Sequence, residues 1–288
     1  MDFDEVLRAQ DGVISRRQAA RCGISPRALR GRVTRGSLRE VAPGVYRSVA
    51  HHPTSWSRIV AASLWAGSDA VVDGPAAAYL HGLLRRLPRG TTIGLTVPAT
   101  TRRTAPAGTR LRRRDLHPAD RAVHRGIGVT APPLTALDTA VVLPDGAAFL
   151  DRALQQGLPF VEVLAAYHRA IGTRGTSRAR DLVIEAGDRA DSRAERRLIG
   201  HLRNAGIAGF VQNMPFGPWF VDIAFPDSRL AIEVDGWAFH SDPQRFRNDR
   251  RKQNALVGAG WTVLRFTWQD IRDRPEETVR RIRRALGA

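Results

Sequence analysis

The residues most suited to chemistry are three carboxylates in a largely apolar stretch near the C-terminal end. Asp222, Glu233 and Asp235 occupy polar positions of two runs, 219–225 and 230–235, in which hydrophobic residues alternate with other residues. Such alternation is typical of strands with one buried face, and the Pro-Asp-Ser sequence between the runs favours a tight turn. The pattern therefore predicts a β-hairpin with three carboxylates on one face.

The length of the turn sets which residues face each other. A loop over 226–229 places Phe225 opposite Leu230 and therefore Asp222 opposite Glu233, with Cβ atoms roughly 4.5–5.5 Å apart. Two like charges at that distance destabilise a hairpin unless something compensates them. A divalent cation is the simplest compensator, because Mg²⁺ takes one or two carboxylates and keeps water and phosphate oxygens as its other ligands. Any one of these carboxylates alone would be explained as a solvated strand residue.

These residues resemble a known nuclease pattern. An Asp on one strand and Glu-x-Asp on the next resemble the PD-(D/E)xK nuclease fold, and residues 231–240 are similar to very-short-patch-repair mismatch endonucleases and to the DUF559 group of nuclease-like domains. The resemblance covers about residues 188–288. It implies a phosphodiesterase that depends on Mg²⁺ (or Mn²⁺), with Asp222 and Glu233 as metal ligands. In the mechanism we expect, Asp235 or His240 orients or deprotonates the attacking water.

The chain departs from that family pattern at the lysine. Where the family has Lys two residues after the acid, this chain has Asp235, and Lys252 is the only lysine in the protein. Lys252 is therefore the single candidate for a displaced catalytic lysine. Its neighbours Arg250 and Arg251 favour a different interpretation, in which all three side chains lie on an exposed helical face.

Two further residues have both a chemical and a structural interpretation. His240 follows the second strand and could take a proton, orient a water or help to hold a metal, or it could be a hydrogen-bonded loop histidine. Glu195 is the fourth residue of Ser-Arg-Ala-Glu, a capping-box pattern that predicts a helix start at Asp191 or Ser192. Glu195 also shares a helical face with leucines three and seven residues later, which points it inward, where related nucleases place a first-helix Glu near the metal.

Charge is the feature in which the composition is most unusual. The 288 residues include 45 basic and 28 acidic residues, which gives a formal net charge of +17 and a pI of about 11.5. A surplus of this size favours a polyanionic partner, with nucleic acid first. Because 44 of the 45 basic residues are Arg, GC-rich coding is an alternative source of the surplus.

Several classes of function lack their sequence signals. The single cysteine cannot form an intramolecular disulfide, and no Cys/His cluster has the spacing of a zinc site. There is no Walker loop, no G-x-G-x-x-G after a strand and no G-x-S-x-G elbow. The N-terminus has no signal-peptide pattern, and no apolar run reaches the length of a membrane span. We therefore expect a cytoplasmic protein without a membrane segment.

Residues 1–50 have the element order of a winged helix-turn-helix. Helix signals begin at Asp2 or Asp4, at Ser15 and at Ser25, and a hairpin follows over 38–47. This order resembles the N-terminal domain of the AbiEi-type antitoxins. The third helix would then enter a DNA major groove and present four arginines, Arg27, Arg30, Arg32 and Arg35. A winged helix kept for packing or dimerisation is the alternative.

The remaining elements complete a multidomain α+β or α/β chain. Residues 51–187 are predicted to be a mixed α/β, mostly helical middle domain, with helices over 55–67, 75–84, 134–143, 146–156, 159–171 and 177–187 and strands over 91–97 and 111–114. Residues 188–288 are predicted to be a restriction-endonuclease-like domain of order α-β-β-β-α-β-α.

The sequence therefore predicts a metal-dependent DNA endonuclease with a DNA-binding winged helix. Phage defence, a toxin–antitoxin pair and DNA repair are all compatible settings, and a homodimer or a toxin–antitoxin partner stays open. The alternative is an antitoxin-like transcriptional regulator that carries a degenerate nuclease fold.

Overall fold

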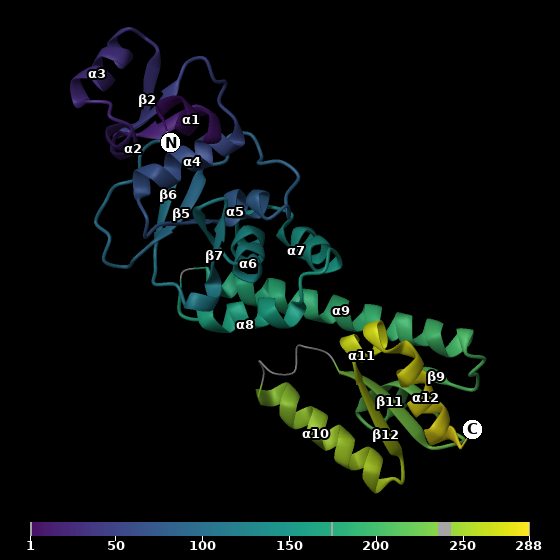
Figure 1. The fold of residues 1–288 in the computed structure, drawn as a ribbon. Helices are drawn as coiled ribbons and strands as arrows, with labels where there is room; N and C mark the ends of the chain where they lie inside the picture. The colour runs from purple at the N-terminus through teal and green to yellow at the C-terminus, as the bar shows by residue number, and fades with distance from the viewer. Residues whose placement is uncertain (1, 174, 236–242, 288) are drawn as a thin grey trace. The chain divides into compact units, whose positions relative to one another are not determined.

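The computed structural model describes residues 2–173, 175–235 and 243–287, and the chain divides into two compact units, Met1–Leu182 and Val183–Ala288 (Figure 1). Within these ranges, no helix combines the length and the apolar content that a membrane span requires. Each unit contains its own sheets and its own buried core. The candidate site lies entirely in the second unit.

The first unit begins with the predicted winged helix. Its elements are α1 (Phe3–Ala9), β1 (Val13–Ser15), α2 (Arg16–Arg21), α3 (Pro26–Thr34), β2 (Leu38–Ala42) and β3 (Val45–Ser48), and the strands form a sheet of order β1-β3-β2. The predicted helix starts are confirmed, because the side chains of Asp2, Ser15 and Ser25 each accept a hydrogen bond from a backbone N–H in the first turn. These caps satisfy donors that a helix start otherwise leaves without partners.

The middle region contains more sheet than the sequence predicts. Five strands form a sheet of order β6-β5-β4-β8-β7, where β5 (Ile93–Val97) and β6 (Thr109–Arg113) correspond to the predicted strands. Three strands were not predicted, namely β4 (Val71–Asp73), β7 (Arg121–His124) and β8 (Ile127–Thr130). The helices are α4 (Ser55–Ala66), α5 (Gly74–Leu80), the 3₁₀ turn η1 (Pro118–Asp120), α6 (Pro132–Val142), α7 (Gly146–Gln155) and α8 (Phe160–Ala170).

Buried side chains join the winged helix to the middle region. Val13 of β1 and Val45 of β3 pack against Val60 and Ala61 of α4, and all four are buried. The two parts therefore share a hydrophobic cluster inside the first unit.

The helix α9 (Thr176–Asn204) corrects the predicted helix start at residue 191 or 192. It is a single helix of 29 residues, so Ser192 lies in its interior. There the Ser192 hydroxyl donates to the carbonyl oxygen of Asp188 at 3.1 Å, which is the back-bonding available to a serine inside a helix. The capping-box interpretation of Glu195 is therefore wrong.

The second unit is built on a four-stranded sheet of order β12-β11-β10-β9. Its strands are β9 (Val211–Phe216), β10 (Trp219–Phe225), β11 (Leu230–Asp235) and β12 (Thr262–Thr267), and its helices after α9 are α10 (Pro243–Gly258), α11 (Trp268–Asp273) and α12 (Pro275–Leu286). The predicted order is confirmed, with α11 as an additional short helix. The pairs β9–β10 and β10–β11 are antiparallel, and β11–β12 is parallel.

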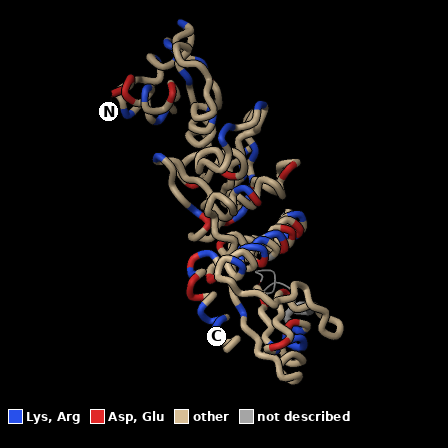
Figure 2. The backbone as a smooth tube through the Cα atoms, turned by 90° about the vertical axis from the view of Figure 1, so that its right-hand side faces the viewer, with Lys and Arg blue, Asp and Glu red and all other residues tan. Residues whose placement is uncertain are grey.

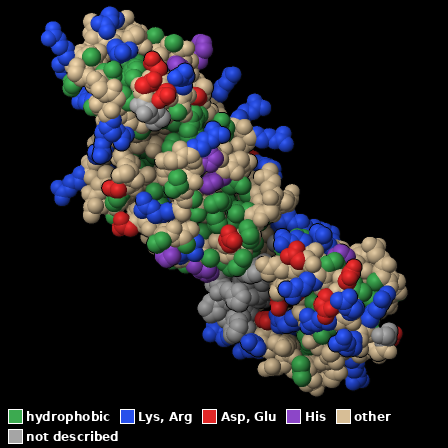
Figure 3. All heavy atoms as spheres, viewed as in Figure 1, with side chains coloured by type: hydrophobic (Ala, Val, Ile, Leu, Met, Phe, Trp, Pro, Cys, Tyr) green, Lys and Arg blue, Asp and Glu red, His purple; other side chains and the backbone are tan. Residues whose placement is uncertain are grey.

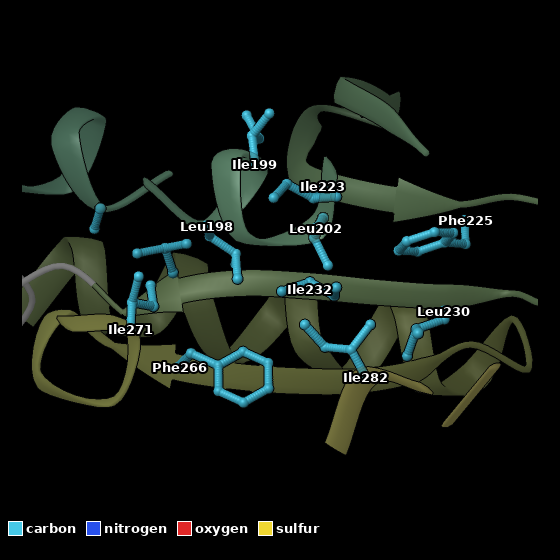
Figure 4. Close-up of a cluster of buried hydrophobic side chains, with 12 residues drawn as sticks. Leu198, Ile199, Leu202, Ile223, Phe225, Leu230, Ile232, Phe266, Ile271 and Ile282 are labelled. Carbon is cyan, nitrogen blue, oxygen red and sulfur yellow. The ribbon is translucent and has the colours of Figure 1, made fainter. Parts of the chain in front are cut away.

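The two faces of this sheet bury different side chains. On one face, residues such as Ile223, Ile232 and Phe266 form a core with Leu198 of α9 and Ile282 of α12 (Figure 4). On the other face, small side chains, Ala224 and Ala231, pack against Leu256 of α10. Glu233 contacts Lys252 of α10, and Arg265 bridges Asp235 to Asp249 of α10, so these two carboxylates lie on the face that α10 covers.

Candidate active site

The central hairpin brings Asp222 and Glu233 together as predicted. Phe225 pairs with Leu230 and Ile223 pairs with Ile232 in an antiparallel register. The pairing ends at Ile223 and Ile232, and the next residues, Asp222 and Glu233, lie close enough for the charge of Asp222 to raise the pKa of Glu233. Positive φ at Arg229 (48°) closes the turn, and its N–H donates to the carbonyl oxygen of Pro226 at 3.1 Å.

The Asp222 carboxylate is fixed by the backbone of the neighbouring strand. Its Oδ2 accepts a hydrogen bond from the Val234 N–H at 2.8 Å. Burial raises the pKa of Asp222, and this hydrogen bond and the charge of Lys252 partly oppose that effect. The carboxylate is therefore held in one orientation at a place where ionisation is costly without a nearby cation.

The structure places Lys252 against Glu233. The Lys252 ammonium donates to Glu233 Oε2, and only 13% of the Lys252 side chain and 8% of the Glu233 side chain are exposed. The interpretation of Lys252 as part of an exposed arginine-rich face is therefore wrong, although Arg250 and Arg251 are exposed. Lys252 belongs to the inner face of α10 because it follows Asp249 by three residues and precedes the buried Leu256 by four.

One oxygen of Glu233 has no hydrogen-bond partner among the described residues. Glu233 Oε1 is buried, and none of these residues donates to it, although a buried carboxylate oxygen normally has a donor. Burial and the adjacent charge of Asp222 raise the pKa of Glu233 to about 7, and Lys252 opposes this rise. The charge of Lys252 therefore compensates the two carboxylates only in part, and a further positive charge would stabilise both in their ionised form.

The donor set fits a hard divalent cation. Asp222 and Glu233 offer carboxylate oxygens, which Mg²⁺ and Mn²⁺ prefer, and the orphaned Glu233 Oε1 would gain a partner. In the part of the chain that the structure describes, no group of three His, Cys, Asp or Glu side chains could hold a metal ion by itself. A Mg²⁺ ion held by two carboxylates would take water and substrate phosphate oxygens as its other ligands.

The raised pKa of Glu233 predicts a pH-dependent cost to stability in the absence of metal. Because the folded pKa of about 7 exceeds the usual 4.5, the folded state binds the proton more tightly, and this stabilisation is lost as pH rises from about 4.5 to 7. At 1.36 kcal/mol per pKa unit, the loss is about 3 kcal/mol. We expect Glu233→Gln to be more stable, relative to wild type, at pH 8 than at pH 5.

Calorimetric melting of the full chain in EDTA measures the stability difference between Glu233→Gln and wild type at each pH. The relevant transition is the one whose melting temperature the substitution changes. Asp227, an exposed carboxylate in the turn of the same hairpin, provides the matched control Asp227→Asn. A stability difference between Glu233→Gln and wild type that is the same at both pH values contradicts the prediction.

Glu195 approaches the carboxylate pair from α9. Its side chain is half-buried, and burial together with the charge of Asp222 raises the pKa of Glu195, while Arg196 and Lys252 lower it. Glu195 therefore lies within electrostatic range of both Asp222 and Lys252. Of the two interpretations of Glu195 from the sequence, the structure supports the inward one.

Asp235 belongs to an ion network rather than to an open carboxylate site. Arg265 of β12 donates from Nε to Asp235 at 2.6 Å, and its two Nη atoms donate to the Asp249 carboxylate at 2.9 and 3.2 Å. The network joins β11, β12 and α10, and its Asp249 lies one helical turn before Lys252. Arg265 and Asp249 were not predicted from the sequence. Their pairing connects residues that are 16 positions apart and has no local sequence signal.

The last candidate of this domain, His240, lies outside the described residues. Its expected role as a base, a water-orienting group or a metal ligand stays a prediction from the sequence.

The four arginines predicted to bind DNA differ in their exposure to solvent. Arg27, Arg30 and Arg35 are exposed on or directly after α3. Arg32 is half-buried, and its guanidinium lies 4.6 Å from the centre of the Phe3 ring, so it packs against α1. Basic residues also occur along the rest of both units (Figure 2), and Figure 3 shows Lys and Arg side chains on the surface of each.

Two family models match this chain. Residues 195–286 match REase_MTES_1575, a restriction-endonuclease-like domain, and residues 2–49 match the model described as "Transcriptional regulator, AbiEi antitoxin". The predicted fusion of a nuclease-like domain to an AbiEi-like winged helix is confirmed.

Relatives with the same span occur in mycobacteria. The uncharacterized proteins Rv2248 and MT2308, from two strains of Mycobacterium tuberculosis (ATCC 25618 / H37Rv and CDC 1551 / Oshkosh), are each 30% identical over 275 residues, which cover 88% of this chain and 94% of the relative. The uncharacterized protein YcjD of Escherichia coli K12 is 36% identical over 87 residues, which are 30% of this chain and 71% of YcjD.

Proposed function

Because this chain belongs to the same family as Rv2248 of Mycobacterium tuberculosis and combines a restriction-endonuclease-like domain with an AbiEi-like regulator domain, we propose that it is a metal-dependent DNA endonuclease. Its winged helix binds DNA, and its second unit hydrolyses phosphodiester bonds. A protein with this activity works in the cytoplasm, where its substrate is.

The contact of Lys252 with Glu233 supports this proposal most strongly. Lys252 is buried against Oε2 of Glu233, and none of the described residues donates to Oε1 of the same carboxylate. This arrangement is costly for a purely structural ion pair. Lys252 thus takes the place of the family's lysine, although it lies on the helix α10 and the family pattern has its lysine on the strand. Perturbed pKa values of Asp222, Glu233 and Glu195 in one place are typical of functional sites.

Asp222 and Glu233 would hold the divalent cation, with Glu195 as a nearby third carboxylate. When bound, such an ion polarises the scissile phosphate and lowers the pKa of the attacking water. In the hydrolysis, the water oxygen bonds to phosphorus, one phosphorus–oxygen bond breaks, and the leaving oxygen takes a proton.

Lys252 stabilises the negative charge that develops on the phosphate. Its ammonium is compact and carries three donors, so it can contact the phosphate while it stays close to Glu233. The network of Asp235, Arg265 and Asp249 holds α10 against β11 and β12, and thereby sets the position of Lys252. We therefore assign to Asp235 a positioning task instead of direct proton transfer.

A transcriptional regulator is the second candidate, because residues 2–49 match a family described as a transcriptional regulator. In that case the second unit would keep the nuclease fold without its activity. A regulator binds a specific operator, and its binding is insensitive to Glu233→Ala. Phage defence, toxin–antitoxin function and DNA repair are settings compatible with the endonuclease.

Incubation with supercoiled plasmid tests the proposal. We expect the purified protein to nick or linearise the plasmid with Mg²⁺ or Mn²⁺, but not with EDTA, and we expect Asp222→Ala to be inactive. Absence of metal-dependent cleavage by the wild type, together with specific operator binding, supports the regulator instead.

The winged helix makes a separate contribution to DNA affinity. Charge reversal at Arg27 and Arg30 should weaken binding to duplex DNA and flatten its salt dependence, since removing one phosphate contact lowers the slope of log K against log salt by about one. Titrations at several KCl concentrations in EDTA measure the slope. Arg152→Glu, a reversal on the exposed surface of α7, is the control. Unchanged affinity and slope after reversal at Arg27 and Arg30 would show that α3 does not contact DNA.

A further inference from the structure

A groove of about 860 Å³ lies in the first unit, between the winged helix and the middle region. Its walls are formed by α2, by the turn between β2 and β3, by the end of α4 with the loop after it, and by the hairpin of β7 and β8. We call it the α2–β7 groove. Neither the nuclease site nor the exposed arginines of α3 line it.

The lining of the α2–β7 groove has one sign of charge. Arg16, Arg17 and Arg21 lie on the α2 side, and Arg121 lies on the opposite wall at the start of β7. All four are exposed, and the lining includes no Asp or Glu among the described residues. The Arg16 guanidinium is also attracted to Glu40, whose own oxygen accepts from the Gly44 N–H at 2.7 Å.

The fold itself does not need this charge. In the six residues of α2 there are three arginines and no acidic residue, and Arg17 and Arg21 are four positions apart, where like charges destabilise a helix. Neither Arg17 nor Arg21 has an ion pair with the described residues of the chain. Arg16 and Arg121 have weak neutral partners, since Arg16 donates to the Tyr46 hydroxyl at 3.2 Å and Arg121 donates to the Asp69 carbonyl at 3.4 Å. A polyanionic partner would compensate the repulsion.

We propose that the α2–β7 groove holds the phosphodiester backbone of duplex DNA, with the β7–β8 hairpin as a second DNA-contacting element. In a helix-turn-helix, the helix before the recognition helix crosses the DNA backbone, and in this chain that helix is α2. Arg121 adds a guanidinium group from the middle region on the opposite wall. The same hairpin leaves Val123 76% exposed at the rim, so its surface is accessible to DNA. This assigns a function in binding to the middle region, and it rests on the proposal that DNA is the substrate.

Salt-dependent binding of the full chain tests this groove. We would measure fluorescence anisotropy of a mixed-sequence duplex of about 30 base pairs in EDTA over a KCl series. For each phosphate that the variant no longer neutralises, the slope of log K against log salt should become less steep by about 0.9. We expect this change for Arg17→Ala and for Arg121→Ala, and we expect about twice the change for the double variant.

Two controls keep the result interpretable. Arg152→Ala removes the same charge from the same unit outside the groove, where Arg152 forms an exposed pair with Asp145 at 3.3 Å, so its slope should equal that of wild type. Arg121→Lys should keep the wild-type slope, and Arg121→Gln replaces Arg121→Ala if the latter melts early. A slope for the neutral Arg121 variants equal to that of Arg152→Ala overturns the proposal, as does a wild type that binds no duplex.

The outcome is separable from the test of the nuclease. Binding is measured in EDTA and needs no catalysis, so a changed slope without any plasmid cleavage upholds the groove and rejects the endonuclease. Metal-dependent cleavage with an unchanged slope rejects the groove alone.

Discussion

Replacing Asp222 or Glu233 with Ala lowers metal-dependent cleavage of duplex DNA by roughly 10³-fold or more, because either change removes half of the carboxylate pair that would hold the cation. DNA binding in EDTA stays intact or improves, since each carboxylate repels phosphate when no metal is present. Cleavage of a labelled duplex under single-turnover conditions, together with binding measured in EDTA, separates the two effects.

The hairpin supplies a matched control for these substitutions. Asp227 is an exposed carboxylate in the turn, and Asp227→Ala should cleave DNA like the wild type. Cleavage that survives Glu233→Ala unchanged would point to a contaminating nuclease and contradict the mechanism.

Replacing Lys252 with Met should lower cleavage about 10²–10³-fold, the reduction expected when one preorganised donor to the reacting group is removed. The pH–rate profile adds a second readout. Lys252 opposes the rise in the pKa of Glu233, so without Lys252 this pKa rises further and the acidic limb of the profile moves to higher pH. Activity measured across pH 5 to 9 detects both changes.

The neighbouring Arg251 is the control for Lys252. It is exposed one residue away on α10, and Arg251→Met removes a positive charge without disturbing Glu233. Lys252→Arg keeps the charge but not the compact ammonium and should recover only part of the activity. A Lys252→Met protein that is folded by its melting curve and cleaves DNA like Arg251→Met would remove Lys252 from the active site.

The hairpin of the site could be predicted from the sequence because its determinants are local. Alternation over β10 and β11 selects the buried face, and the length of the turn selects the register of Phe225 with Leu230, so that the proximity of Asp222 and Glu233 could be predicted. The winged helix was predictable for a similar reason, since Ser15 and Ser25 are caps whose bonding partners lie three residues away.

The elements that the sequence did not predict depend on distant partners. The strand β4 has three residues and gains its stability between β5 and β8, both of which are far from it in sequence. Ser192 has the same sequence context as a helix cap, but α9 begins well before it, and residues of that earlier part, Leu182, Val183 and Ala186, are buried.

The sequence placed Lys252 on an exposed face because of its neighbours. Its charged neighbours dominate the local composition, whereas the spacing of Asp249, Lys252 and Leu256 at three and seven positions marks one helical face. That face is the inner one because Leu256 packs on the sheet and Arg265 holds Asp249. The periodicity of α10 could therefore have identified Lys252, but its contact with Glu233 required the structure.

The metal claim is tested most directly by melting the full-length protein in the presence of divalent ions, because this measurement does not depend on DNA or on contaminating nucleases. A ligand that binds only the native state stabilises it by about 2.7 kcal/mol at a concentration of 100 times Kd. We predict that millimolar Mg²⁺ or Mn²⁺ raises the melting temperature of the wild type and of Asp227→Asn, but not that of Asp222→Asn. Metal binding by Asp222 and Glu233 is contradicted if divalent ions at these concentrations leave the melting temperature of the wild type unchanged, or if they raise that of Asp222→Asn equally.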